Sequence, residues 1–210
     1  ISMVAVANRQ ELSHQYPTRS YVTSLKVAKE FIIVGDLYNG LSFLRWVGND
    51  FRLFREDKEP SHVLHTGFMI AERQIALAKA DEAGNFAVFL VGNHQARLQK
   101  QGDFHLGSPI ASMNQIRLNY VTQSGETSLV HGVVVSTREG EIGVVMPITY
   151  EDYSVLMLLQ KRIIEKLPQN GALNPLNFRK YAPEGPLRYP REKKVLDMGV
   201  IRRYLLLSSP

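Results

Sequence analysis

The chain has 210 residues, 44% of them hydrophobic and 21% charged, which is typical of a folded globular protein and excludes an intrinsically disordered one. It has no cysteine and no run of roughly 18 apolar residues, which excludes disulfides, zinc–thiolate sites, thiol nucleophiles and membrane-spanning helices. The net charge of +5 belongs to the last 63 residues: residues 1–147 contain 14 basic and 14 acidic residues, and residues 148–210 contain 11 and 6.

The first residues, ISMVAVANRQELS, lack the basic segment and long apolar core of a signal peptide. Because the chain begins with Ile rather than Met, we expect it to be a piece of a longer protein. The lack of cysteine agrees with a reducing intracellular compartment.

A repeated pattern then runs through the first two thirds of the chain. It occurs as FIIVGDLYNGLSFLRW (31–46), QIALAKADEAGNFAVFLV (74–91) and LVHGVVVSTREGEIGVVMP (129–147). Each copy is an apolar run, a polar turn ending in glycine and a second apolar run, and glycine supplies the positive φ of a tight hairpin. The turn glycines are 44 and 56 residues apart. Repeats of about 40–45 residues with four strands each are typical of propeller blades.

The pattern predicts strands in three units. They lie near 22–27, 31–36, 41–47 and 51–56; near 63–69, 74–80, 85–91 and 95–101; and near 110–117, 129–136 and 141–147. The third unit lacks an outer strand, and three blades cannot close a ring, since propellers use about 4–8. We therefore expect a mainly β fold of about three propeller blades over residues 1–148, with a β-sandwich as the alternative.

A small basic helical domain is predicted over residues 149–210. Leu156, Leu159, Ile163 and Leu167 share one helical face, Thr149 and Asp152 resemble a capping box, and Pro168 ends the helix. Asn174-Pro175 predicts the start of a second helix, and Asp197 the cap of a last one.

The sequence offers no catalytic constellation, so we expect a protein that is not an enzyme and uses no cofactor. His62 and His65 form an HxxH pair without an evident third metal ligand. The DLYNG and ADEAGN turns do not lead from a strand into a helix, as a phosphate-binding loop would, and are predicted to be hairpin turns. The aromatic residues Phe43, Trp46, Phe51 and Phe54 could stack on bases, but blade packing is the favoured interpretation.

The basic residues of the C-terminal part are the candidates for a partner or RNA interface, against the alternative of an ordinary solvated surface. They are Lys161, Arg162, Arg179, Lys180, Arg188, Arg191, Lys193, Lys194, Arg202 and Arg203.

FIIVGDLYNGLSFLRW, DFHLG (103–107) and GEIGVVMP (140–147) together resemble the carboxyl-terminal region of the CPSF-A family. LMLLQKRIIEKLP, GALNPLNFRKY (171–181) and VLDMGVIRRYLLLS (195–208) favour the polyadenylation branch of that family. The resemblance implies a partial seven-bladed propeller followed by helices, whose missing strand comes from the remainder of a longer chain.

The same resemblance implies a nuclear, non-catalytic scaffold of the pre-mRNA 3′-end cleavage and polyadenylation complex. Its partners would be a WD-repeat subunit and a zinc-finger subunit, with contact to pre-mRNA mainly through them. Two alternatives stay open: an adaptor in a ubiquitin ligase, DNA-repair or splicing complex, and a direct RNA-binding module that uses the basic tail.

Overall fold

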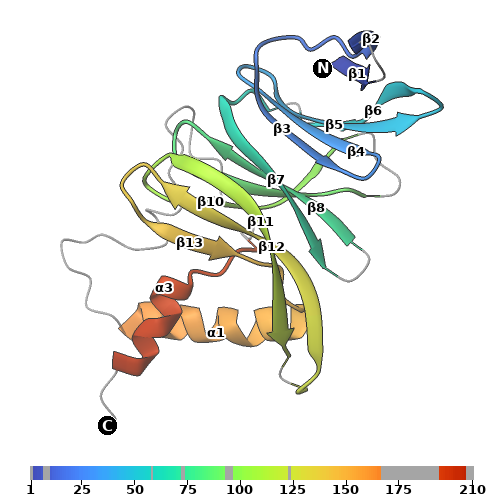
Figure 1. Ribbon diagram of the computed structural model, residues 1–210. Coiled ribbons are helices and arrows are strands. Elements are labelled where there is room, and N and C mark those ends of the chain that lie inside the picture. The colour runs from blue at the N-terminus through green and yellow to red at the C-terminus, as the bar shows by residue number, and fades with distance from the viewer. Residues whose placement is uncertain are drawn as a thin grey trace.

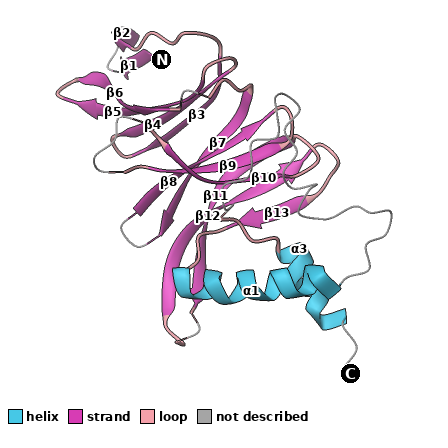
Figure 2. Cartoon of the chain, turned by 180° about the vertical axis from the view of Figure 1, so that it is seen from behind, coloured by secondary structure: helices cyan, strands magenta, loops and turns pink. Residues whose placement is uncertain are grey.

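A computed structural model describes residues 2–6, 10–57, 59–71, 74–92, 97–122, 124–166 and 194–206, with side chains from His14 onward and up to Leu205. The protein is mainly β, with a small helical part at its C-terminal end (Figure 1 and Figure 2). This confirms the predicted fold class. No helix among the residues described is both long and apolar enough to cross a membrane.

The strands form three antiparallel meanders. Meander one is β3 (Val22–Ala28), β4 (Phe31–Asp36), β5 (Gly40–Val47) and β6 (Asp50–Glu56). Meander two is β7 (Val63–Ala71), β8 (Gln74–Asp81), β9 (Asn85–Leu90) and β10 (Gln99–His105). Meander three is β11 (Ile110–Val121), β12 (Thr127–Thr137) and β13 (Ile142–Val145). A further hairpin, β1 (Ser2–Val6) and β2 (Gln10–Gln15), precedes them and was not predicted.

The acid of the DLYNG turn, which follows β4, binds the backbone of that turn. The Asp36 carboxylate accepts hydrogen bonds from the backbone N–H groups of Tyr38 (2.8 Å) and Asn39 (3.0 Å) and from the Ser20 N–H (3.1 Å). Burial alone would raise the pKa of Asp36, but these bonds, with those from the Ser20 hydroxyl and the Asn39 amide, outweigh it and lower that pKa. The carboxylate therefore closes its own hairpin.

Equivalent turns close the other two meanders. Asp81 accepts from the Asn85 N–H at 2.9 Å, and the Thr137 hydroxyl accepts from the Glu141 N–H at 3.1 Å. Each turn contains a positive-φ glycine, at +90° for Gly40, +78° for Gly84 and +90° for Gly140. The predicted hairpin turns are confirmed at all three places.

The core lies between neighbouring meanders, and pairing of β7 with β12 also joins meanders two and three into one sheet. Ile33 and Phe43 of meander one meet Phe68, Leu77 and Phe89 of meander two in one buried cluster. A second cluster joins meander two to meander three and contains Met69, Ala78, Phe86, Ile110, Met113 and Val133. The four aromatic residues considered above, Phe43, Trp46, Phe51 and Phe54, all belong to β5 or β6 and pack against neighbouring apolar side chains.

Polar contacts reinforce the junction of meanders one and two. The Ser24 and Thr66 hydroxyls of β3 and β7 are 2.8 Å apart, so these two first strands lie side by side. Lys79 of β8 forms an ion pair with Asp57 at 2.5 Å, and both side chains are 6% exposed. The Lys79 ammonium also donates to Ser61 Oγ at 3.0 Å and lies 5.1 Å from the centre of the Phe89 ring.

Two strand predictions need correction. The last strand of meander two runs over 99–105 and not 95–101, and it continues through Gly102 with a register shift between Lys100 and Gly102. A Cβ at Gly102 would lie 2.6 Å from Cγ2 of Val195, so this glycine permits close packing of the C-terminal segment. The β11–β12 hairpin is also longer than predicted, because its tip packs on the helical part.

The helical part contains α1 (Tyr150–Lys166), α3 (Met198–Ile201) and the 3₁₀ helix η2 (Arg202–Leu206). Of the predicted apolar face of α1, Ile163 is buried and Leu159 packs beside it, whereas Leu167 lies outside the described residues. The predicted Asn174-Pro175 helix also lies outside them.

Candidate partner or nucleic-acid interface

Helix α1 is attached to meander three at its N-terminal end. The Asp152 N–H donates to Thr149 Oγ1 at 3.3 Å, which is the N-cap contact that the sequence predicted. The Asp152 carboxylate, itself buried, accepts from the Thr149 hydroxyl at 2.8 Å and from the Tyr120 hydroxyl of β11. Burial, and then the hydrogen bond and charge of Asp152, raise the pKa of Tyr120 to about 12.

Helix α3 crosses α1 near the middle and C-terminal turns of α1. Asp197 caps α3, as predicted, by accepting from the N–H groups of Gly199 (2.9 Å) and Val200 (3.3 Å). The Asp197 N–H donates to Gln160 Oε1 at 2.7 Å, and Val200 packs against Ile163 and Ile164 in a small apolar cluster. These contacts fix η2, the continuation of α3, relative to α1.

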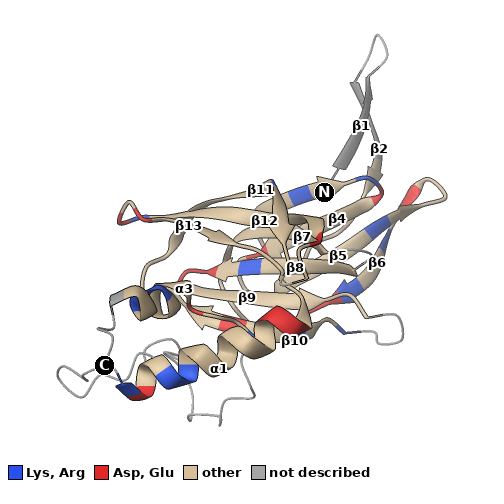
Figure 3. Ribbon diagram, turned by 90° about the horizontal axis from the view of Figure 1, so that it is seen from below, with Lys and Arg blue, Asp and Glu red and all other residues tan. Residues whose placement is uncertain are grey.

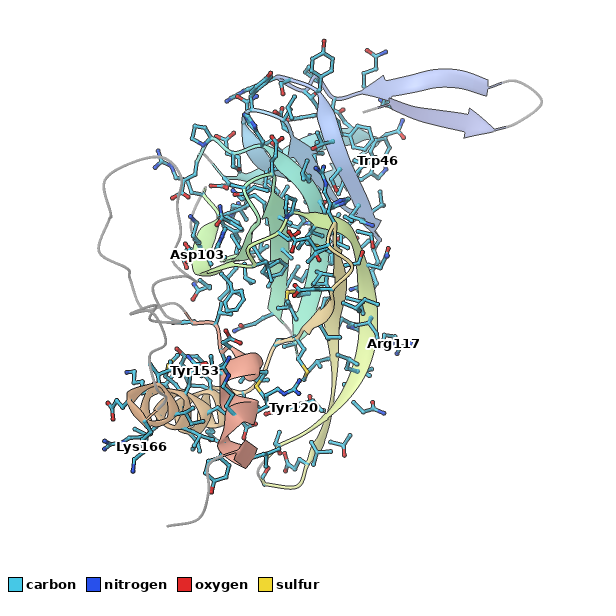
Figure 4. All side chains as sticks on the ribbon, turned by 90° about the vertical axis from the view of Figure 1, so that its left-hand side faces the viewer. Trp46, Asp103, Arg117, Tyr120, Tyr153 and Lys166 are labelled. Carbon is cyan, nitrogen blue, oxygen red and sulfur yellow. The ribbon has the colours of Figure 1, made fainter. Side chains whose placement is uncertain are left out.

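Four of the predicted basic residues are exposed on the helical part. Lys161 and Arg162 are exposed on α1, and Arg202 and Arg203 are exposed on η2, which follows directly on α3. Figure 3 shows Lys and Arg positions in blue on α1 and beside α3. Lys166 adds a further cation at the end of α1 (Figure 4). Arg162 contacts Glu165 at 3.3 Å in a bridge whose partners are 71% and 64% exposed, so solvent screens it strongly.

Lys194 lies elsewhere. Its ammonium donates to Gln101 Oε1 of β10 at 3.3 Å, which ties the segment before α3 to meander two. The other five predicted residues, Arg179, Lys180, Arg188, Arg191 and Lys193, lie outside the described part of the chain. The structure therefore places four of the ten predicted residues on α1 and η2, and a fifth against β10.

Apolar side chains beside these cations were not predicted as part of the site. Leu158 is 59% exposed, Tyr204 57% and Leu205 83%. The helical period of the sequence indicates that Leu158 is exposed, because Leu158 falls outside the face formed by Leu159 and Ile163. No comparable signal exists for Leu205, whose exposure follows from the path of η2.

The two histidines of the HxxH pair have different surroundings. His62 Nδ1 lies 3.1 Å from Glu82 Oε2, and its ring meets Tyr38 edge-on. Burial, together with the nearby charge of Lys26, lowers the pKa of His65. Within the described ranges, no three His, Asp or Glu side chains are grouped so that they could hold a metal ion.

Comparison with known proteins gives one consistent result. The family model described as the CPSF A subunit region matches residues 7–206. The "Cleavage and polyadenylation specificity factor subunit 1" of Arabidopsis thaliana is 27% identical over 195 residues, which are 89% of this chain and 13% of that protein. The "Probable cleavage and polyadenylation specificity factor subunit 1" of Oryza sativa subsp. japonica is 25% identical over 92% of this chain and 14% of its own.

A fungal protein extends the comparison beyond plants. "Protein cft1" of Schizosaccharomyces pombe is 24% identical over 201 residues, or 90% of this chain and 14% of that protein. The chain thus spans about one seventh of the length of the relatives that it matches.

Proposed function

Because the chain belongs to the CPSF-A family, which the match over residues 7–206 shows, we propose that it is a non-catalytic scaffold segment of the pre-mRNA 3′-end cleavage and polyadenylation complex. The observation that carries the proposal is the similarity over about nine tenths of the chain to plant and fungal proteins, two of which bear the name of that factor. The segment acts in the nucleus, where this RNA processing takes place.

The architecture supports a scaffold built from propeller blades. Meanders one to three are blades, and their first strands, β3, β7 and β11, lie next to one another where the axis of the ring would be. The propeller part extends over residues 1–148 and the basic helical domain over residues 149–210. Helix α1 begins directly after this boundary, at Tyr150.

The remainder of the longer chain completes meander three. In the described part of the chain, β13 pairs with β12 along one edge, and its apolar residues Ile142 and Val144 are 78% and 52% exposed. A strand with one unpaired edge and exposed apolar side chains recruits a further strand. We assign that strand to another part of the same protein, which closes the ring.

The partners are other cleavage and polyadenylation subunits, among them a WD-repeat subunit and a zinc-finger subunit, which carry most of the contact with pre-mRNA. The exposed cations Lys161, Arg162, Arg202 and Arg203 support an accessory, salt-dependent contact with phosphates or with acidic side chains.

A tagged pull-down of the full-length parent protein from nuclear extract, with and without nuclease, tests the proposal. We expect mass spectrometry to identify cleavage and polyadenylation subunits that remain bound after nuclease treatment. Recovery of ubiquitin-ligase, DNA-repair or splicing subunits in their place would overturn it. Loss of all partners on nuclease treatment would instead favour a module that binds RNA directly.

A further inference from the structure

Three side chains from meanders one and two contact one another where the hairpin turns lie. Tyr38 follows β4 in the first turn, His62 precedes β7, and Glu82 follows β8 in the second turn. The rings of Tyr38 and His62 meet edge-on with their centroids 5.4 Å apart, and His62 Nδ1 lies 3.1 Å from Glu82 Oε2. The Glu82 N–H also donates to the His62 carbonyl oxygen at 3.0 Å. These contacts join the three residues into one surface, which we call the turn surface.

The turn surface is open to solvent, although its backbone is fixed. Tyr38 is 56% exposed, and the side chains of His62 and Glu82 are 51% and 61% exposed. The Asp36 carboxylate holds the Tyr38 N–H at 2.8 Å, and Asp81 holds the second turn through the Asn85 N–H. An exposed aromatic ring on an ordered turn loses little conformational freedom when it binds a partner. None of the three residues belongs to the core clusters of the described chain, so they are available for recognition.

The hairpin turns around this surface carry negative charge. Because β8 and β12 both run antiparallel to β7, the turns that follow them lie at the same end of the sheet. Residues 37–39, 82–84 and 138–141, which form the three turns, include three exposed glutamates and one exposed arginine. These are Glu82, Glu139, Glu141 and Arg138. Three cations of neighbouring strands and loops pair with carboxylates: Lys79 with Asp57, Lys100 with Glu59, and Arg19 with Glu56.

This charge decides which ligand suits the exposed ring. Single-stranded nucleic acid binds where aromatic rings line a positively charged groove, whereas Glu82 would repel its phosphates. A cation is attracted both by the face of a tyrosine ring and by a carboxylate. The guanidinium of arginine is planar, so it can stack on a ring while its N–H groups donate to a neighbouring carboxylate.

We propose that the turn surface binds an arginine-bearing segment of a partner protein, with the guanidinium on the Tyr38 ring and bonded to the Glu82 carboxylate. The His62 ring, which contacts both side chains, acts as a positioning residue between them. The inference rests on the proposed scaffold function and specifies the chemistry of one of its partners.

The test begins with cross-linking in the tagged, full-length parent protein. Tyr38 is replaced by the photo-cross-linker benzoylphenylalanine, and the protein is irradiated in nuclear extract with and without nuclease. Mass spectrometry identifies the segment that becomes attached to position 38. A synthetic peptide with the sequence of that segment is then titrated against the parent protein and against its Tyr38→Ala and Glu82→Lys variants. The matched control carries Tyr150→Ala and Glu151→Lys on α1, where both residues are exposed.

We expect the cross-linked segment to belong to a cleavage and polyadenylation subunit, to contain arginine, and to be recovered after nuclease treatment. Tyr38→Ala and Glu82→Lys should each weaken peptide binding by about tenfold or more, as for loss of an interface hot spot, and the control should leave it unchanged. A peptide with its arginine replaced by glutamate should bind Glu82→Lys more tightly than it binds the parent protein. A merely structural role of Glu82 would not produce that reversal. Hydrogen exchange of the two hairpins should be unchanged in Tyr38→Ala, because the substituted ring is exposed.

Four results would overturn the inference while leaving the scaffold function intact, provided that the parent protein still recovers cleavage and polyadenylation subunits. They are a cross-link to none of these subunits, a cross-linked segment without arginine, a cross-link that disappears on nuclease treatment, and peptide binding that neither variant weakens. If the parent protein recovers no such subunit, the proposed function fails, and this inference fails with it.

Discussion

The buried ion pair between Lys79 and Asp57 provides a sharp test of how meanders one and two are held together. Replacing Lys79 with Met removes the cation but leaves the Asp57 carboxylate in a site where only 6% of it reaches solvent. An unpaired buried charge of this kind costs about 3–5 kcal/mol. The Asp57 carboxylate keeps only the Glu59 N–H, at 3.1 Å, as a remaining donor among those identified for it.

The cost can be measured in the parent protein as the free energy of local opening, by hydrogen exchange over β4, β5 and β8. A loss of about 3–5 kcal/mol speeds exchange a hundredfold or more, since each 1.4 kcal/mol is a factor of about ten. The double variant Lys79→Met with Asp57→Leu should recover most of the loss, because it leaves no buried charge.

Lys100→Met is the matched control. Lys100 also forms an ion pair, with Glu59, but the two side chains are 33% and 62% exposed. Its loss should therefore cost no more than about 1 kcal/mol. The reasoning is refuted if Lys79→Met opens no more easily than Lys100→Met, or if the double variant is less stable than Lys79→Met alone.

Three further predictions concern the turns and the attachment of the helical part. Asp36→Ala should destabilise the first hairpin at neutral pH. Because the pKa of Asp36 is lowered in the folded protein, its carboxylate stabilises the hairpin above the unfolded pKa, and this stabilisation is lost as pH falls through the folded pKa. Hydrogen exchange of the hairpin in both proteins at pH 7 and near pH 3 would show the difference in stability at the higher pH only. Gly140→Ala should destabilise its hairpin by about 1–2 kcal/mol because of its φ of +90° alone. Gly40→Ala should destabilise its hairpin more, because the added Cβ would also lie 2.9 Å from the Glu59 carbonyl oxygen. An equal increase of hydrogen exchange in the two substituted hairpins would contradict this. Tyr120→Phe should weaken the attachment of α1 to β11 and so speed proteolysis of α1. Because the pKa of Tyr120 is raised from 10.0 to about 12, the stabilisation that its hydroxyl provides is present below pH 10 and is lost as pH approaches 12. An unchanged rate of proteolysis in Tyr120→Phe would argue against this attachment.

Sequence patterns were most informative where local chemistry decides the structure. A polar turn ending in glycine between two apolar runs predicted three hairpins. In each of them a side chain, Asp36, Asp81 or Thr137, bonds to its own turn. Thr149 and Asp197 likewise marked the starts of α1 and α3. These features depend on residues a few positions apart, which a sequence displays directly.

Features decided by distant contacts were not accessible in this way. The strand near 95–101 was predicted too early in the chain, and the close approach of Val195 to Gly102 of that strand joins segments far apart in the sequence. Of the candidate interface, the sequence supplied the cations but not where each of them lies in the fold. Lys194 and Arg202 are close in sequence, yet the first contacts β10 and the second begins η2, after the helix α3 that packs on α1. The exposure of Leu205 follows from the same packing.

The order of the strands has a consequence for how the protein forms during synthesis. Every described strand pair except β12–β7 joins neighbours in the sequence, so each meander closes short loops and loses little chain entropy in doing so. Meander one can therefore form as soon as it leaves the ribosome and present Ile33 and Phe43 as a template for meander two, which in turn receives meander three. Helix α1 can attach only after the β11–β12 hairpin has formed, because that hairpin positions the Tyr120 hydroxyl that binds Asp152.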